Sequence, residues 1–389
     1  MNKSFSSLLL LTVLLLSACT SSPQKSSANY VVDLEERKKI TLPIDERTYY
    51  LSQSIFQFEK DGKEFLHFEN TERNQYNLIF FDLVNQCEHK RVNLSKHGPN
   101  EIIGLLGSRT YGDSIIFLFE HNIGRTSIIN DEGQVMRRYP MQVADGKFVY
   151  NMVNSYYYEP SFIKDSKIYL SQGLLNRGIK KDDWKDIHMF ASLDLHSGAV
   201  ERIPLYYPSI FNKDVYNPGG GYSFTYDYNY KEERLVCSFQ GYDSLMVSDD
   251  LKTVKWFDGR SRYLMNLRPE VLEATGKVAT MVKFKERAKY SHIMYDKYRD
   301  VYYRFAEHPY ELSPDESPYV EPNGREFSVI VFNDQFEIIG ETKFPGNKYF
   351  YKMSFVGRDG LYISENNEAN PEFDENKLVF ACFGLKDLE

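Results

Sequence analysis

Short strand-like runs recur along almost the whole chain, and this recurrence limits the fold more than any other feature. The runs are continuously apolar or alternate apolar and polar residues, which indicates β-strands rather than helices. Turns rich in Gly, Asp and Asn separate them, and they fall into groups of four. The first group is Ser52–Phe58, Glu64–Glu69, Tyr76–Leu83 and Glu88–Leu94. A four-stranded unit that repeats every ~40–50 residues is typical of β-propeller blades.

Five further groups follow the first and extend the pattern to the end of the chain. They span Ile103–Met141, Ser155–Leu205, Tyr222–Asp258, Tyr290–Phe344 and Tyr351–Phe383. The sixth group has three strands, and an unpaired strand-like run, Lys38–Pro43, lies at the other end of the chain. A propeller closes its ring by pairing such a strand with its last blade, because pairing removes an exposed sheet edge.

The repeat therefore predicts an all-β fold, a six-bladed β-propeller with the N-terminal strand closing the last blade. Residues 30–389 are expected to form this propeller as one domain. A pair of β-sandwiches and a seven-bladed ring are the alternative architectures.

The first eighteen residues have the pattern of a signal peptide. Lys3 precedes the apolar run Leu8–Leu16, which is too short to span a bilayer at roughly 20 residues and has the length of a signal-peptide core. Leu16-Ser17-Ala18-Cys19 follows at once and resembles the lipobox of bacterial lipoproteins. The alternative is an ordinary signal peptide that contains a cysteine. We expect residues 1–18 to be removed, Cys19 to carry the lipid, and the polar, Ser-rich residues 19–29 to form a flexible tether.

This anchor places the protein at the cell envelope, with the membrane as a partner through the lipid on Cys19. Thr20 follows the cysteine, whereas Asp there resembles the inner-membrane retention signal of enteric bacteria. The absence of Asp favours the outer membrane over the inner. Periplasmic and surface-exposed orientations are both open.

Composition excludes some classes of function. The net charge of −8 argues against a nucleic-acid partner, which requires a basic surface. Besides Cys19 there are three cysteines, and an odd number is not a disulfide framework. Cys237 and Cys382 lie in apolar strand-like runs, which predicts buried thiols.

Three stretches together resemble a known family. They are the lipobox, the turn His97-Gly98-Pro99-Asn100-Glu101-Ile102, and the run Tyr290–Arg304. With these stretches the chain is similar to the six-bladed β-propeller lipoproteins of uncharacterised function from gut Bacteroidota. Many of those propellers read Gly-x-Gly-Pro-Gly-Glu at the blade exit, so Lys96-His97-Gly98 and Asn100 fit a subfamily variant. The resemblance implies the propeller fold and no established activity.

No motif for a cofactor, a metal or a catalytic nucleophile stands out. The eight histidines are scattered without metal-ligand spacing, and no G-x-S-x-G elbow occurs. Two acidic clusters, Glu311–Glu321 and Glu365–Glu375, are either solvated loop charge or ligands for Ca²⁺. The turn at His97–Ile102 either presents a ligand-binding loop or supplies the dihedral angles of a blade crossing. His292 is expected on an inner strand, as a channel-facing or a structural residue.

The long insertions are predicted to share one face of the propeller. In a blade of alternating strands, the loops between strands two and three open on the same face as the loops to the next blade. In this assignment the loops on that face include every long segment: Gln142–Asn154, Gly173–Ile187, Tyr206–Gly221, Gly259–Lys289, Glu307–Arg325 and Glu365–Glu375. One of them has a helix-like pattern that starts at Pro269 and ends at Gly276. Function concentrates in long loops on a rigid scaffold, so we expect the ligand there, over the central channel.

Eight residues of these segments are the candidate contacts for that ligand. They are Arg177, Lys181, Trp184, Tyr222, Arg260, Arg262, His308 and Tyr310. Trp184 lies in a charged loop, where it either contacts ligand or packs against the helical segment. A binding or interaction module for a glycan, a peptide or an envelope protein is the function predicted here. The alternative is an envelope enzyme, a hydrolase or lyase acting on glycans or peptides over the channel, because a propeller hosts both.

Overall fold

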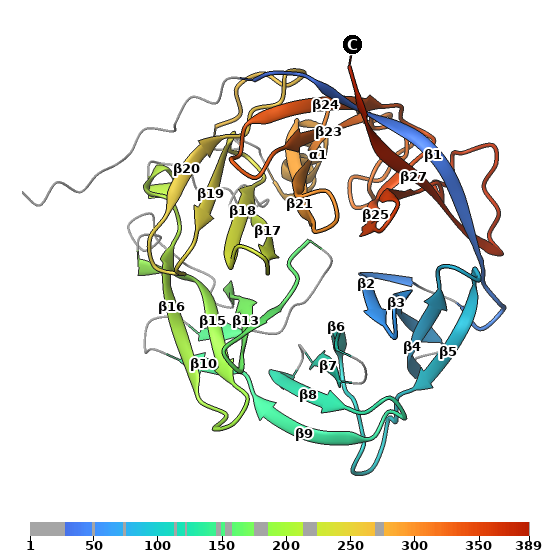
Figure 1. The fold of residues 1–389 in the computed structure, drawn as a ribbon, viewed down its shortest axis with the longest axis vertical. Helices are drawn as coiled ribbons and strands as arrows, with labels where there is room; N and C mark the ends of the chain where they lie inside the picture. The colour runs from blue at the N-terminus through green and yellow to red at the C-terminus, as the bar shows by residue number, and fades with distance from the viewer. Residues whose placement is uncertain are drawn as a thin grey trace, which may run out of the picture.

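The computed structural model describes residues 28–48, 51–72, 75–112, 115–120, 123–144, 149–151, 158–174, 186–212, 224–268 and 276–388. Within these ranges the fold is all-β, with a propeller-like arrangement of sheets around a common centre (Figure 1). The predicted signal peptide and Cys19 lie outside the described residues. No helix within the described ranges has the length and apolarity to cross a membrane.

Four sheets have four antiparallel strands each, paired in the order of the sequence. The first contains β2 (Leu51–Lys60), β3 (Lys63–Glu72), β4 (Gln75–Asp82) and β5 (Cys87–Asn93), and the second β6 (Leu105–Tyr111), β7 (Ile115–Glu120), β8 (Arg125–Ile129) and β9 (Val135–Pro140). The third contains β12 (Phe162–Lys164), β13 (Lys167–Ser171), β15 (His188–Asp194) and β16 (Val200–Tyr206), and the fourth β17 (Phe224–Asn229), β18 (Arg234–Phe239), β19 (Ser244–Ser248) and β20 (Lys255–Asp258). These bounds agree with the first, second and fourth predicted groups to within a few residues.

The fifth and sixth predicted groups share one eight-stranded sheet. Its order is β21 (Lys289–Asp296), β22 (Val301–Glu307), β23 (Phe327–Phe332), β24 (Ile338–Phe344), β1 (Val32–Pro43), β27 (Lys377–Asp387), β26 (Gly360–Ser364) and β25 (Phe350–Gly357). The N-terminal strand β1 pairs antiparallel with β27 from Val32 opposite Asp387 to Pro43 opposite Lys377. The predicted pairing of Lys38–Pro43 with the last group is confirmed, and the strand is longer than predicted. With β24, β1 shares one parallel pair, Val32 with Gly340.

One sequence prediction about the segments between the sheets is wrong. The segments 142–154 and 173–187 were expected to be loops, but β10 (Gln142–Ala144), β11 (Val149–Asn151) and β14 (Gly173–Leu174) pair into a three-stranded sheet. The helix-like pattern that starts at Pro269 lies outside the described residues as far as residue 275; the helix that the structure describes is α1 (Lys277–Glu286), which follows Gly276 with φ at 120°. That φ is far from helical values and suits glycine, so the helix begins after Gly276. A short 3₁₀ turn, η3 (Ser209–Asn212), follows β16.

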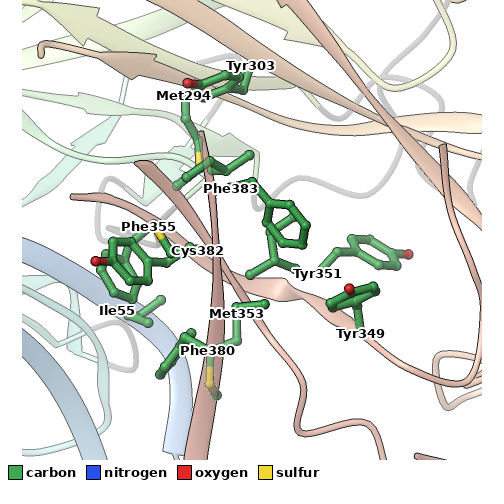
Figure 2. Packing of buried hydrophobic residues seen from close by; sticks show 14 of the residues in the cluster. Ile55, Met294, Tyr303, Tyr349, Tyr351, Met353, Phe355, Phe380, Cys382 and Phe383 are labelled. Atoms are coloured by element: carbon green, nitrogen blue, oxygen red, sulfur yellow. The ribbon is translucent and has the colours of Figure 1, made fainter. Parts of the chain in front are cut away.

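The core lies between neighbouring sheets, because successive side chains of a strand point to opposite faces. In β4, Leu78 and Phe80 pack with β7 of the second sheet, in a cluster that includes Leu118. The alternate residues Ile79 and Phe81 pack instead in the cluster that contains β25, β26 and β27. Figure 2 shows part of that cluster, where side chains from separate strands meet. Each large side chain buried in this way contributes roughly 1.5–3 kcal/mol to stability.

The first strand of each unit lies nearest the centre. Figure 1 shows β2, β6, β17, β21 and β25 on the inside of the ring and β5, β9, β16, β20 and β24 on the outside, with β1 outside β27. Neighbouring inner strands contact one another, for example β17 with β21 and β2 with β25. The inner strands therefore surround the channel, and the residues along them determine what its two ends can bind.

Candidate functional site

Two cavities lie at opposite ends of this channel. The first, of about 230 Å³, is lined by residues at the starts of inner strands, such as Phe224 of β17 and Lys289 of β21. The second, of about 260 Å³, is lined by residues further along the same strands, such as Asp227 and Tyr295. We call the first the loop-end cavity, because the chain enters each inner strand there, and the second the hairpin-end cavity, because the inner strands turn there into their second strands.

Charged side chains dominate the loop-end cavity. Lys289 of β21 and Lys352 of β25 reach it from inner strands, and Lys285 reaches it from α1. Glu307, at the end of β22, and Glu321, in the segment after it, lie opposite them. The remaining lining residues are Tyr158, Glu159, Phe224, Thr225, Gln240, Phe284 and Ser291.

Ion pairs connect these charges into one network. Oε2 of Glu321 lies 2.6 Å from Nζ of Lys285 and 2.8 Å from Nζ of Lys352. Nζ of Lys289 lies 3.1 Å from Oε2 of Glu307. Nε of Arg325 lies 3.6 Å from Glu321 and 3.8 Å from Glu307. Four cationic side chains thus surround two carboxylates, which leaves the network cationic.

The network shifts the protonation of its members. Burial raises the pKa of Glu321, but Lys352, Lys289 and Lys285 outweigh it and hold the pKa well below its usual value. Burial lowers the pKa of Lys289, and Glu307 and Glu321 offset only part of that effect. Burial also disfavours the ammonium of Lys352, but the two carboxylates prevail and raise its pKa. Glu321 therefore stays ionised as the common partner of the lysines.

Glu159 lines the same cavity, but its pKa is shifted in the opposite direction from that of Glu321. Burial raises its pKa to about 7, although a hydrogen bond that Ser171 donates to Oε2 at 2.7 Å acts in the opposite direction. Tyr226 donates from its hydroxyl to the backbone carbonyl of Glu159 at 3.3 Å, which fixes this residue against β17. A carboxyl group with such a pKa can hold or release a proton near neutral pH.

The long segments predicted to share one face meet at this end of the channel, as far as they are described. Lys285 of segment 259–289 pairs with Glu321 of segment 307–325. Asn367 of segment 365–375 donates from Nδ2 to the carbonyl of Asn323 at 3.0 Å. The ring of Tyr207, at the start of segment 206–221, lies 5.7 Å from the ring of Phe224. These contacts place the described parts of four long segments around the loop-end cavity.

Two of the predicted contact residues lie away from the cavity lining. Nε of Arg260 is 3.4 Å from Oδ2 of Asp243, and its side chain is half exposed. Arg262 lies over the ring of Tyr30 at 4.5 Å and donates to the carbonyl of Glu341 on the outer strand β24. Arg260 therefore contacts the loop between β18 and β19, and Arg262 contacts the outer strand β24. Neither residue lines the loop-end cavity.

Two others lie beside the ionic network. Nη1 of Arg325 donates to the carbonyl of His308 at 2.9 Å, and its guanidinium lies 5.8 Å from the ring centre of Tyr310. The ring of Tyr263, next to Arg262, is 5.7 Å from the ring of His308. The segment that contains Arg262 therefore contacts the segment that contains His308. Arg177, Lys181, Trp184 and Tyr222 lie outside the described residues.

Sequence reasoning did not identify the residues that form the network. No sequence motif connects these residues, which are separated along the chain: Lys285, Lys289, Glu307, Arg325 and Lys352. The expectation of solvated charge is wrong for Glu321, whose side chain is 15% exposed, because three lysines surround it. It is also wrong for Glu365, which is buried and pairs with Lys39 and Lys348. A lysine or glutamate at the buried end of a strand is the one local signal that could have suggested such a network.

The remaining motifs have structural roles. Gly98 has φ at +81°, and Asn100 accepts a hydrogen bond from the backbone of Val135, so this turn joins two sheets. His292 is buried, bonds Ser291 and stacks on Phe305. Cys237 and Cys382 are buried free thiols, as predicted, and Cys87 is exposed. Within the described ranges, no three His, Cys, Asp or Glu side chains are placed to hold a metal ion.

Comparison with known proteins identifies the family. The family described as "Domain of unknown function (DUF4221)" matches residues 32–343, and the chain belongs to it. The crystal structure of a DUF4221 member from Bacteroides vulgatus is 54% identical, with a TM-score of 0.88 over 92% of this chain and 100% of that chain. A putative exported protein from Bacteroides fragilis shares the fold at 9% identity, with a TM-score of 0.51 over 94% of this chain and 99% of that chain. No curated protein matches the chain.

Proposed function

We propose that this DUF4221 member is a lipid-anchored, six-bladed propeller of the bacterial cell envelope that binds its ligand at the loop-end cavity. The ionic network supports the proposal most directly. Burying charges is costly, and a network with more cations than carboxylates in a cavity is incomplete without a further anion. A ligand with acidic groups supplies that charge.

The way the eight-stranded sheet divides supports the proposal of six blades. β21 to β24 form one antiparallel unit, and β25, β26, β27 and β1 form another. The two units share one residue pair, Val32 with Gly340. Counted as two blades, they bring the number of four-stranded units to six. The long antiparallel pairing of β1 with β27 is the closure that such a ring requires.

The lipid anchor rests on the sequence of the N-terminus. The apolar run Leu8–Leu16 and the lipobox at Cys19 predict export, cleavage and acylation. The tether would then connect Cys19 to β1, which starts at Val32. Thr20 after the cysteine favours the outer membrane.

Exposed apolar side chains on the long segments support binding at this end. Within the described parts of these segments, seven large hydrophobic side chains are exposed: Tyr206, Tyr263, Met265, Val278, Tyr319, Val320 and Phe373. Exposed apolar groups rimmed by charge are typical of interaction surfaces. The ligand we propose is therefore a glycan or peptide with acidic groups, or an acidic segment of an envelope protein.

A second candidate function is an envelope hydrolase or lyase with its site in the same cavity. The observation that favours it is the pKa of Glu159, about 7, which suits a general acid or base. A Glu159→Gln variant separates the two functions, because it abolishes turnover by an enzyme and leaves a binding protein able to retain its ligand.

The test is a glycan and peptide binding screen on the chain from residue 28. We expect acidic ligands to be retained and their neutral counterparts to be lost. Lys352→Gln should weaken binding about tenfold, because a hydrogen bond to a charged group contributes roughly 1.5–3 kcal/mol. The matched control is Lys343→Gln. Lys343 lies on the outer strand β24 and forms an exposed ion pair with Glu326. Equal affinity in the Lys352 and Lys343 variants would contradict the proposal.

A further inference from the structure

The hairpin-end cavity is a second concave site on the channel, and none of the charged residues of the loop-end cavity lines it. Inner strands of five sheet units contribute to it. Its lining residues are Ile55, Phe56, Gln57, Arg109, Pro160, Asp227, Tyr228, Tyr230, Lys231, Met294, Tyr295, Lys297, Phe355 and Val356. Aromatic side chains and a few polar groups make up most of this wall, which is the composition of small-molecule sites.

Arg109 is one of the charged residues that line this cavity. It projects from β6, and its guanidinium lies 4.5 Å from the ring centre of Phe56 and 5.6 Å from that of Tyr111. Among the described residues its side chain has no hydrogen-bond or ion-pair partner. Stacking on aromatic rings satisfies the faces of a guanidinium but leaves its N–H donors, which lie in its plane, available.

The other cations of this cavity already have acidic partners. Lys231 forms an ion pair with Asp300, and Nζ of Lys297 lies 2.9 Å from Oε1 of Glu59. Arg109 is thus the lining cation whose charge remains available to a ligand. Its planar fork of donors matches the two oxygens of a carboxylate.

Asp227 supplies an acceptor in the same wall. Each of its carboxyl oxygens accepts one backbone N–H at 2.8 Å, Oδ1 from Tyr228 and Oδ2 from Tyr295. A carboxyl group has about four acceptor positions, so two remain for a ligand. Burial raises the pKa of Asp227 to about 6, and the nearby Arg109 counteracts part of this effect. A hydroxyl or ammonium group of a ligand can therefore donate to Asp227.

We propose that the hairpin-end cavity binds a small carboxylate that also carries a hydroxyl or ammonium group. The carboxylate pairs with Arg109, and the donor group pairs with Asp227. The cavity, about 260 Å³, is at the small end of ligand sites and fits a sugar acid or an amino acid rather than a polymer. The ring of Phe56 holds the guanidinium in place before the ligand arrives, which reduces the entropy lost on binding.

Calorimetric titration of the full chain in detergent tests the proposal. Galacturonate represents the sugar acids and glutamate the amino acids, while galactose and inorganic phosphate lack the carboxylate. We expect one of the two carboxylates to bind about tenfold or more tightly than galactose and phosphate. Arg109→Gln should weaken that binding about tenfold or more, and Arg109→Lys should weaken it as well, because lysine cannot bind a carboxylate with two parallel N–H bonds.

The matched control is Arg137→Gln. Arg137 also stacks on an aromatic ring, 4.7 Å from Tyr139, but it is exposed and donates to the carbonyls of Leu195 and His196. Its substitution should leave the affinity unchanged. A crystal structure of the wild-type chain with the ligand, expected to show the carboxylate on Arg109, gives the answer even if the Arg109 variants do not fold.

Several outcomes would overturn the proposal. They are no binding of either carboxylate, equal binding of galactose, tighter binding of phosphate, an unchanged affinity in Arg109→Gln, or a ligand located away from Arg109. Lys352→Gln should leave carboxylate binding here intact, so the hairpin-end cavity is tested separately from the loop-end cavity.

Discussion

Nζ of Lys352 lies 2.8 Å from Oε2 of Glu321, and this ion pair joins the inner strand β25 to the segment between β22 and β23. Because Lys285 of α1 contacts the same oxygen, one carboxylate fixes three parts of the chain at the loop-end cavity. Buried pairs of this kind add little stability by themselves but are costly to break. The arrangement therefore determines the shape of the cavity more than the stability of the ring.

The first prediction concerns removal of the Glu321 charge. Glu321→Gln leaves Lys285 and Lys352 without their common carboxylate, and we expect the free energy of unfolding to fall by about 3 kcal/mol. Glu311→Gln, an exposed change in the same segment, should stay within about 0.5 kcal/mol of wild type. Urea denaturation measures both variants. A Glu321 variant as stable as the Glu311 variant would show that the network does not depend on this carboxylate.

A second prediction concerns closure of the ring. A chain that starts at residue 46 lacks β1 and exposes the edge of β27, to which β1 is paired along its full length. We expect this chain to melt at a lower temperature or to aggregate, compared with a chain that starts at residue 28. Thermal melts followed by circular dichroism compare the two. Coincident melting curves would mean that β1 does not stabilise the ring.

The strands were predictable because each sheet repeats the same local pattern. The predicted run Tyr76–Leu83 matches β4 to within one residue, since an apolar strand of this kind is bounded by turn residues. The strands β10, β11 and β14 were missed because they are two or three residues long, which is too short for a periodicity to appear. The pattern also does not specify that β24 and β27 flank the same strand, since that pairing depends on the ring as a whole.

The candidate site was predictable in position but not in its residues. The long segments indicated the loop end of the channel, because segment length is visible in the sequence. Lys289, Glu307 and Lys352 were missed because charged residues at strand ends usually face solvent. Here the inner strands converge, and three-dimensional proximity turns these separate charges into one network.

A third prediction concerns the anchor. Cys19→Ala removes the thiol that would accept the lipid, so the protein should be exported but not acylated. Metabolic labelling with an alkyne fatty acid measures this directly, and Cys87→Ala is the matched control, because Cys87 is an exposed thiol of the described fold. We expect label on wild type and on the Cys87 variant but none on the Cys19 variant. Equal label on all three proteins would exclude Cys19 as the acylation site.

The last prediction concerns the pH dependence of stability that Glu159 introduces. Its pKa rises from 4.5 in the unfolded chain to about 7 in the folded protein, mainly through burial. The folded state then holds a proton that the unfolded state releases, so stability contributed by this group is complete below pH 4.5 and falls as the pH rises to about 7. The loss amounts to at most about 3.5 kcal/mol, since one pKa unit corresponds to roughly 1.4 kcal/mol.

Glu159→Gln removes this titration while keeping the size of the side chain. The variant should therefore gain stability relative to wild type as the pH rises from 4 to 8. Asp165→Asn, in the exposed turn between β12 and β13, is the control and should follow the wild-type profile. Urea denaturation at pH 4, 6 and 8 measures the difference. Parallel profiles for wild type and Glu159→Gln would show that this carboxyl group has the same pKa in the folded and the unfolded chain, and would remove the observation that favours an enzymatic function.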